Sequence, residues 1–255
     1  MEKNDGAINK SQNAEPDSGL CARDIAKMID HSLLHPGLTD QELEMECKIA
    51  VECDAAAVCV KPCHAARASE LLAGTDVMVS AVIGFPHGNS TTAVKLFETE
   101  QVLEDGANEV DMVVNIGKVL SRDWVYVERE ISQINRLTKQ YNAILKVIFE
   151  NDLLPDDEFK IKLCRICSKC GVAFVKTSTG YNYNKDEDGR YSYKGATEHD
   201  LKLMRQYSSP DVQVKAAGSV STLDAILKVR EWGVTRVGTK GTKKAVDDAK
   251  TRFGR

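Results

Sequence analysis

Four charged residues stand inside short apolar segments of this chain, where a buried strand would normally carry none. They are Asp111 in Glu-Val-Asp-Met-Val-Val, Lys146 in Ile-Leu-Lys-Val-Ile, Lys176 in Phe-Val-Lys-Thr-Ser and Lys215 in Val-Gln-Val-Lys-Ala-Ala. An unpaired buried charge costs several kcal/mol, so four of them indicate one shared polar site. Three cations against one anion argue against the alternative, a buried salt-bridge network without chemistry, because that network would keep uncompensated charge.

A cluster of this composition suits the chemistry of an amine nucleophile. Crowded ammonium groups that are partly removed from water disfavour one another, which predicts a lowered pKa for at least one lysine. A neutral lysine amine adds to carbonyl groups and forms an imine, or Schiff base. Asp111 is expected to carry the protons that such a reaction moves, either directly or through a water molecule.

The segments that hold these charges belong to a regular alternation of short apolar runs and longer amphipathic stretches. The apolar runs are Met28–His31, Ala55–Val60, Val77–Ile83, Glu109–Val114, Ala143–Phe149, Val172–Lys176, Val212–Ala216 and Val234–Val237. Continuous apolar runs are typical of parallel strands that are buried on both faces. The stretches between them indicate helices, one of which opens with the capping box Thr39-Asp-Gln-Glu42.

Eight strand–helix units predict a single (β/α)8 barrel, an α/β fold of about 250 residues, with an open doubly wound sheet as the alternative. The barrel domain is assigned to residues 20–255. Residues 1–19 are polar and nearly free of aliphatic side chains, so we expect a disordered tail there. In a barrel, the charged residues of strands four to seven can all point inward near the C-terminal mouth, where barrel enzymes carry out their chemistry.

Two loops after the seventh and eighth runs are rich in small residues and lead into helices. They read Ala217-Gly218-Ser219-Val220-Ser221 and Val237-Gly238-Thr239-Lys240-Gly241. Glycines let backbone N–H groups approach an anion, and a helix N-terminus adds a favourable dipole. These loops predict a phosphate site at the usual place in a barrel. Gly180 is expected to form a third wall, beside a Thr179 that contacts the substrate.

Composition limits the other classes of function. A formal net charge of -4 provides no field that would attract nucleic acid or an anionic membrane, and no apolar run is long enough to cross a bilayer. The N-terminus lacks the apolar centre of a secretory signal, so we expect a soluble cytoplasmic protein.

Cysteine and histidine spacing gives little support for a metal. Cys164, Cys167 and Cys170 match part of an iron–sulfur ligand set but lack the fourth cysteine, and we interpret them as buried small hydrophobes. The histidines have no metal-binding spacing. We therefore expect neither a metal nor a cofactor.

The motifs together resemble those of the deoxyribose-phosphate aldolase family. Val175-Lys-Thr-Ser-Thr-Gly180 is similar to the signature around that family's Schiff-base lysine, and the likeness extends from about Ala22 to Val246. The other matching motifs are Ile29-Asp-His-Ser-Leu-Leu34, Val58-Cys-Val60, Gly84-Phe-Pro-His-Gly-Asn89, Glu109-Val-Asp-Met-Val-Val-Asn115, Leu145-Lys-Val-Ile148 and Val214-Lys-Ala-Ala-Gly218.

The resemblance implies a (β/α)8 barrel and a class I aldolase reaction without a metal. The reaction is reversible cleavage of 2-deoxy-D-ribose 5-phosphate to D-glyceraldehyde 3-phosphate and acetaldehyde. Lys176 would form the imine, Lys215 would perturb its pKa, and Asp111 would transfer protons. The positions that would line the substrate are Asp30, Cys59 and Lys146. A homodimer is one assembly that the resemblance leaves open.

Several features depart from the family pattern. Ser219 replaces a second glycine and Lys240-Gly241 replaces a serine pair, so both changes fall in the phosphate loops; we expect phosphate to be held partly through Lys240. Residues 181–194 form a longer loop than usual, either a lid or a solvated insertion, and the second is favoured. The C-terminus lacks the tyrosine tail of some members.

These departures leave two alternatives open. One is an imine-forming aldolase of the same family that takes a different or unphosphorylated aldehyde. The other is a catalytically silent barrel that acts as a binding protein.

Overall fold

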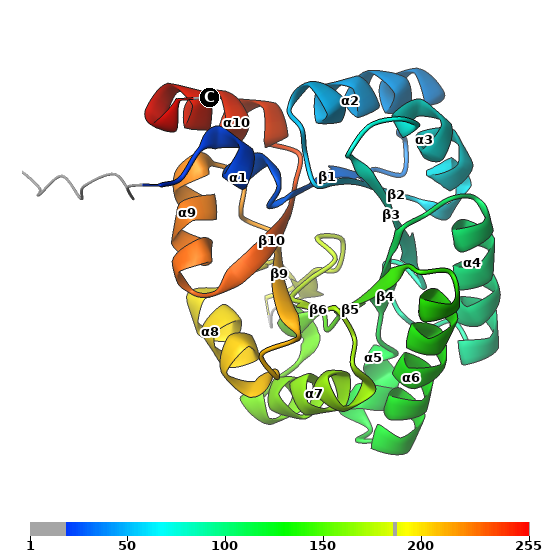
Figure 1. Cartoon of the computed structure of the whole chain (residues 1–255). Helices are drawn as coiled ribbons and strands as arrows, with labels where there is room; N and C mark the ends of the chain where they lie inside the picture. The colour runs from blue at the N-terminus through cyan, green and yellow to red at the C-terminus, as the bar shows by residue number, and fades with distance from the viewer. Residues whose placement is uncertain (1–18, 186–187, 255) are drawn as a thin grey trace, which may run out of the picture.

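In a computed structural model, described over residues 19–185 and 188–254, eight parallel strands close into a barrel (Figure 1). The order around the barrel is β1-β10-β9-β6-β5-β4-β3-β2. The strands are β1 (Ile29–Leu33), β2 (Ala57–Val60), β3 (Met78–Ile83), β4 (Glu109–Val113), β5 (Ile144–Ile148), β6 (Phe174–Lys176), β9 (Gln213–Ala217) and β10 (Val234–Thr239). The predicted barrel is confirmed and the open sheet is wrong. The expected tail, residues 1–19, lies outside the described residues except for Gly19.

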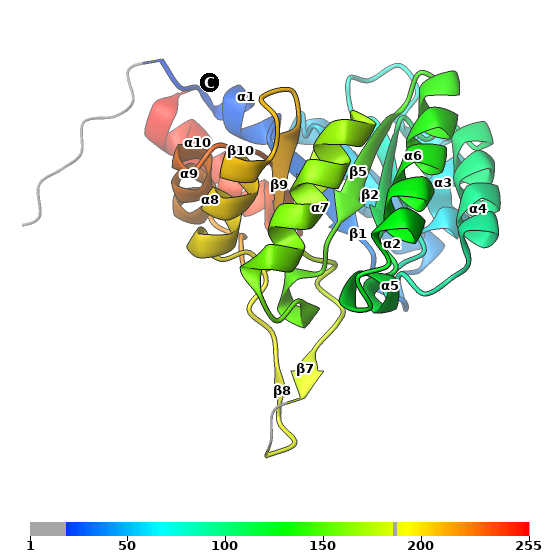
Figure 2. The ribbon, with the colours of Figure 1, turned by 90° about the horizontal axis from the view of Figure 1, so that it is seen from below.

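Helices surround the strands as an outer ring (Figures 1 and 2). They are α1 (Ala22–Ala26), α2 (Asp40–Glu52), α3 (Ala65–Leu72), α4 (Thr92–Glu104), α5 (Ile116–Leu120), α6 (Trp124–Gln140), α7 (Asp157–Cys170), α8 (Glu198–Tyr207), α9 (Leu223–Glu231) and α10 (Thr242–Phe253). Two short 3-10 helices, η1 (Pro62–His64) and η2 (Asn151–Leu153), follow β2 and β5. The first and last helices, α1 and α10, lie side by side and so close the ring.

Side chains at the helix ends fix where the helices begin and stop. The predicted capping box is present, since the Thr39 hydroxyl accepts from the Glu42 N–H and the Glu42 carboxylate accepts from the Thr39 N–H. Thr222 caps α9 in the same way by accepting from Ala225. Gly171 ends α7 with φ +63°, a conformation that glycine adopts without steric cost.

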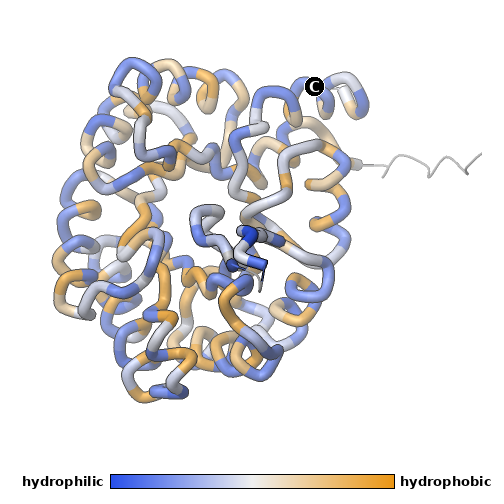
Figure 3. The backbone as a smooth tube through the Cα atoms, turned by 180° about the vertical axis from the view of Figure 1, so that it is seen from behind, coloured by the Kyte–Doolittle hydropathy of each residue, from blue (hydrophilic) through white to orange (hydrophobic). Residues whose placement is uncertain are grey.

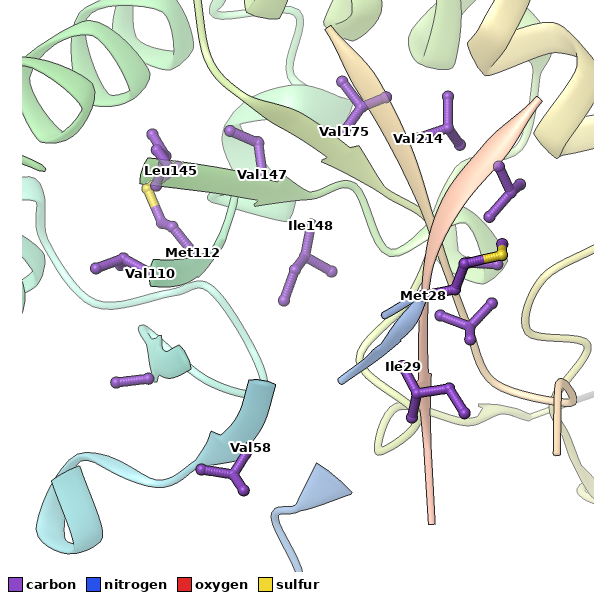
Figure 4. Packing of buried hydrophobic residues seen from close by; sticks show 14 of the residues in the cluster. Met28, Ile29, Val58, Val110, Met112, Leu145, Val147, Ile148, Val175 and Val214 are labelled. Atoms are coloured by element: carbon purple, nitrogen blue, oxygen red, sulfur yellow. The ribbon is translucent and has the colours of Figure 1, made fainter. Parts of the chain in front are cut away.

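The hydrophobic core fills the layer between the strands and the ring of helices. Figure 4 shows Val110 and Met112 of β4 beside Leu145 and Val147 of β5, all fully buried. Hydrophobic and hydrophilic stretches alternate along the surrounding helices (Figure 3), as expected for helices with one face on a sheet. Burial on both faces explains why the barrel strands are almost continuously apolar, and why a charge within them is costly.

The loop after β6 carries a small antiparallel hairpin, β7 (Asn184–Lys185) and β8 (Tyr191–Ser192), on the C-terminal side of the barrel. It projects away from the barrel (Figure 2), and the views from opposite ends both place it across the opening (Figures 1 and 3). Within the described part of the chain, none of the helices combines the length and apolar character needed to cross a bilayer.

Candidate active site

The four charged residues singled out in the sequence lie on four neighbouring strands. β4, β5, β6 and β9 are consecutive in the barrel, and the register places Asp111 opposite Lys146 and Lys176 opposite Lys215. All four side chains are buried. The prediction that these charges form one cluster inside the barrel is confirmed.

Asp111 is the centre of the cluster. One carboxylate oxygen, Oδ2, accepts from Lys176 at 2.7 Å and from Lys215 at 2.7 Å. The other, Oδ1, accepts from Lys146 at 2.9 Å and from the Ser80 hydroxyl at 3.0 Å. Because two ammonium groups share one oxygen, Lys176 and Lys215 are close neighbours, and a proton on Lys176 lies within direct reach of Asp111.

A second group of charges completes the cluster toward β10 and β1. Asp30 accepts from Lys146 at 3.0 Å, from Lys215, and from Arg236 at 2.6 Å. Glu109 lies 2.5 Å from Lys146 and 3.0 Å from Arg236. Asp30 and Lys146 were predicted from the sequence to line the substrate, whereas Glu109 and Arg236 were not predicted. Arg236 did carry a signal, since it is a charge in the apolar segment Val234–Val237.

The charge balance differs from the predicted excess of three cations over one anion. The carboxylates are Asp30, Glu109 and Asp111, and the cations that contact them are Lys146, Lys176, Lys215 and Arg236. Three anions therefore offset all but one of four cations. If Lys176 loses its proton, the buried cluster becomes neutral.

The prediction of a lowered lysine pKa is wrong for two of the lysines. Burial acts to lower the pKa of Lys176, but the charge of Asp111 at 2.7 Å and its hydrogen bond to Lys176 hold that pKa above its usual value. Burial likewise acts to lower the pKa of Lys146, and the carboxylates around it raise the pKa well above normal. The cause is the number of carboxylates, because Asp30 and Glu109 join Asp111 in the cluster.

A pocket of about 250 Å³ opens beside Lys176 at the C-terminal ends of the strands. Residues from four segments line it: Ser32 and Leu34; Lys176 and Thr179 to Tyr181; Ala217 to Ser221; and Gly238 to Lys240. Every residue predicted to bind phosphate, Gly180, Gly218, Ser219, Gly238, Thr239 and Lys240, is among them. The candidate nucleophile and the candidate phosphate loops thus face one space.

The two phosphate loops contact each other closely. A Cβ atom on Gly241 would lie 2.3 Å from the Ser221 carbonyl oxygen, so only glycine permits this approach. Ser219 has φ +64° and therefore keeps a glycine-like backbone in spite of its side chain. Among the described residues, no protein group accepts a hydrogen bond from the N–H groups of Ser219, Val220 or Ser221. Exposed Lys240 stands just before α10. Free N–H groups, a helix N-terminus and a cation are the elements of an anion site.

Thr179 lines the pocket, but its polar groups already have partners. Its N–H donates to Glu150 at 3.1 Å, its hydroxyl donates to the same carboxylate, and its oxygen accepts from Tyr181 at 3.0 Å. Glu150 is fully buried at φ +58°, and burial raises its pKa although Thr179 and Asn182 donate to it. This arrangement supports a role in shaping the turn at Gly180 more than the predicted substrate contact.

Comparison with known proteins now identifies the family. The model of the DeoC/LacD family aldolases matches residues 25–234. The chain belongs to this family of aldolases. A deoxyribose-phosphate aldolase of Rhodopirellula baltica is 46% identical over 231 residues, which are 91% of both chains. One from Clostridium perfringens is 42% identical over 218 residues, covering 86% of this chain and 92% of its own.

Solved structures agree with this assignment. A deoxyribose phosphate aldolase from Aeropyrum pernix, described as a tetramer, superimposes with a TM-score of 0.80 at 30% sequence identity. The match covers 91% of this chain and 93% of that one.

Leu34 and Tyr181, which line the aldolase pocket, are backed by apolar residues. Leu34 clusters with buried Cys59 and Val82, and the rings of Tyr181 and Phe85 pack against this cluster with centroids 5.5 Å apart. Asp30, Cys59 and Lys146, which were predicted to line the substrate, are not among the residues that line the pocket. Burial raises the pKa of the Cys59 thiol, so Cys59 is a neutral, weakly polar neighbour of Lys176. A surface of this kind suits a short hydrocarbon group on the substrate side of Lys176.

The cysteines of α7 and the histidine of α8 are not among the residues that line the aldolase pocket. Cys164 and Cys167 are buried in α7, where burial raises their pKa values, while Cys170 is half-buried. Their burial favours the interpretation as small hydrophobes. The ligand atoms of His199, Asp157 and Asp200 lie within 4.8 Å of one another on α7 and α8, but His199 and Lys160 already pair with these carboxylates.

Proposed function

We propose that this aldolase cleaves 2-deoxy-D-ribose 5-phosphate reversibly to D-glyceraldehyde 3-phosphate and acetaldehyde through an imine on Lys176. The observation that carries the proposal is the shared pocket, in which a buried lysine and the two glycine-containing loops after β9 and β10 face the same space. The names of the relatives support the same reaction.

The reaction begins when the neutral amine of Lys176 adds to the aldehyde carbon, C1, of the open-chain sugar. Loss of water from the carbinolamine gives the iminium ion. A base then removes the proton of the C3 hydroxyl, the C2–C3 bond breaks, and its electron pair forms a neutral enamine on Lys176. D-glyceraldehyde 3-phosphate leaves with the new C3 carbonyl. Protonation of the enamine at C2 and hydrolysis by the water released earlier give acetaldehyde and the free amine.

Asp111 favours the cationic forms of Lys176. Its Oδ2 lies 2.7 Å from the Lys176 nitrogen, so it stabilises the ammonium ion and, in our proposal, the iminium ion, which agrees with the raised pKa of Lys176. The iminium nitrogen then accepts the electron pair of the C2–C3 bond and becomes the neutral enamine.

Asp111 is the group best placed to move protons. Its Oδ2 lies 2.7 Å from Lys176, which is hydrogen-bond distance for the proton that the amine must lose. Burial acts to raise the pKa of Asp111, but Lys146, Lys176 and Lys215 together hold it well below normal. In our proposal Asp111 therefore holds the proton only briefly and passes it on. Lys215 and Asp30 keep the carboxylate oriented toward Lys176.

A second candidate function follows from the departures in the phosphate loops. Ser219 and Lys240 change the residues around the anion site, and this change favours an aldolase of the same mechanism with an unphosphorylated or different aldehyde. The two candidates differ only in what occupies the loops. Cytoplasmic location and a homodimer stay predictions.

The deciding experiment compares initial cleavage rates on 2-deoxyribose 5-phosphate and 2-deoxyribose, with Lys176→Ala as control. We expect a strong preference for the phosphorylated sugar that disappears in Lys176→Ala while the fold is retained. Comparable activity on the free sugar would favour the second candidate. Cleavage of neither sugar would overturn the first candidate and leave an aldolase for a different aldehyde or the binding-protein alternative.

A further inference from the structure

The hairpin after β6 is neither a free lid nor a wholly solvated insertion. Strand β8 is solvated, since Tyr191 has an exposed fraction of 71%. The base of the hairpin, where the chain returns to the barrel through residues 193–196, lies against the phosphate loop after β9. The two ends of this hairpin therefore have different surroundings, and the base carries the contacts that matter for the pocket.

Backbone contacts join the hairpin base to the phosphate loop. The Ser219 hydroxyl donates to the Lys194 carbonyl at 3.1 Å, and the Ala196 N–H donates to the Gly218 carbonyl at 3.3 Å. A Cβ atom on Gly195 would lie 3.0 Å from the Gly218 carbonyl carbon. On the other side, Asp152 accepts from the N–H groups of residues 194 and 195 at 3.0 and 2.9 Å. The base is thus held between η2 and the loop.

Tyr193 fills a notch between two glycines of the pocket wall. A Cβ atom on Gly218 would lie 1.8 Å from the Tyr193 hydroxyl oxygen, and one on Gly180 would lie 3.7 Å from it. The Tyr193 ring meets the Tyr183 ring edge to face, with centroids 5.7 Å apart. Its hydroxyl is buried, and neither it nor the neighbouring Ser178 hydroxyl forms a well-aligned hydrogen bond with a described residue. The hydroxyl is therefore held by packing against Gly218.

We propose that Tyr193 is a positioning residue for the phosphate end of the pocket and thereby sets the preference for a phosphorylated substrate. Its hydroxyl packs under Gly218 at φ +81°, and the adjoining Lys194 carbonyl holds Ser219 at φ +64°. These two contacts fix the loop whose N–H groups have no protein acceptor. Free loops lose anion affinity because their N–H groups must be ordered on binding. This inference rests on the proposed phosphate-binding function.

The kinetic test uses Tyr193→Ala, Tyr193→Phe and, as the matched control, Tyr191→Ala on the exposed strand β8 of the same hairpin. In Tyr193→Ala we expect KM for 2-deoxyribose 5-phosphate to rise about tenfold, because a loop that is no longer held in place should lose affinity worth about one hydrogen bond from its N–H groups to the phosphate. Its kcat, and both constants for 2-deoxyribose, should stay near wild type. Tyr193→Phe keeps the ring in the notch and should recover most of the phosphate preference, and Tyr191→Ala should match wild type.

A binding measurement separates this inference from the reaction itself. Calorimetric titration with inorganic phosphate should give weaker binding for Tyr193→Ala than for Tyr191→Ala, and this comparison does not require turnover. Borohydride trapping of acetaldehyde on Lys176 in the same variants checks that the catalytic end is intact. Equal losses on both sugars, equal phosphate affinity in the two variants, or an equal effect of Tyr191→Ala would overturn the role of Tyr193. Failure of the wild type to cleave either sugar would instead overturn the proposed reaction.

Discussion

Arg236 offers a direct test of the buried charge network. It does not line the pocket, yet it contacts two carboxylates of the network. Its guanidinium donates to Asp30 at 2.6 Å and to Glu109 at 3.0 Å. Only 14% of its side chain is exposed. In Arg236→Met, Asp30 Oδ1 loses this donor, and Glu109 is left with Lys146.

The expected cost follows from burial. Removing one partner of a buried ion pair costs about 3–5 kcal/mol, because the other charge stays buried and unpaired. Asp30 and Glu109 each keep a lysine, so we expect the lower end, about 3 kcal/mol. For a chain of this size such a loss lowers Tm by roughly 6–12 °C. Arg252→Met is the matched control, since Arg252 pairs with Asp224 at 2.7 Å on the surface and should lose less than about 1 kcal/mol.

Urea unfolding at pH 7 measures both variants, together with Glu109→Gln and the double variant Arg236→Met/Glu109→Gln. The double variant should be more stable than the sum of the single losses predicts, because it removes both members of the pair. A loss in Arg236→Met no larger than that in Arg252→Met, or strict additivity in the double variant, would refute the view that the network is a tightly coupled buried unit.

Three further predictions concern the phosphate side of the barrel. Burial lowers the pKa of His31 below 6.5 in spite of Glu46. The stability that neutral His31 contributes is therefore present above pH 6.5 and is lost as the pH falls below that value. Urea unfolding between pH 7 and 5 should show a steeper decline of the free energy of unfolding in the wild type than in His31→Asn. Gly218→Ala should be less stable than Gly74→Ala, because both glycines have φ near +80° but only a Cβ on residue 218 would lie 1.8 Å from the Tyr193 hydroxyl oxygen. By urea unfolding, Gly74→Ala should cost about 1–2 kcal/mol for the backbone conformation alone. Equal costs for the two variants would contradict the packing argument. Lys240→Ala should raise KM for the phosphorylated sugar about twofold to fivefold, as expected for one exposed cation near an anion, and an unchanged KM would remove Lys240 from the site.

The barrel and the core of the site could be predicted from the sequence for a common reason. Strands buried on both faces must be continuously apolar, so a charge such as Lys176 or Asp111 stands out from the sequence of such a strand. The phosphate loops were visible because glycines precede helices after two consecutive strands, as Gly218 and Gly238 do.

What could not be predicted depends on contacts across the closed barrel. Glu109 begins a strand, where an acidic residue is ordinary, and only barrel closure brings Arg236 of β10 to it. The direction of the lysine pKa shift was mistaken because it depends on these unseen charges. Tyr193 lies after a run of charged residues with no apolar pattern, and its notch is formed by the backbones of Gly180 and Gly218, which leave no pattern in the sequence.

The central claim is that Lys176 forms the imine, and covalent trapping tests it most directly. The wild-type protein would be treated with acetaldehyde and sodium borohydride, digested, and analysed by mass spectrometry. We predict a single reduced adduct on Lys176, absent in Lys176→Ala. An adduct on Lys146 or Lys215, or no adduct in a folded wild-type protein, would contradict the account.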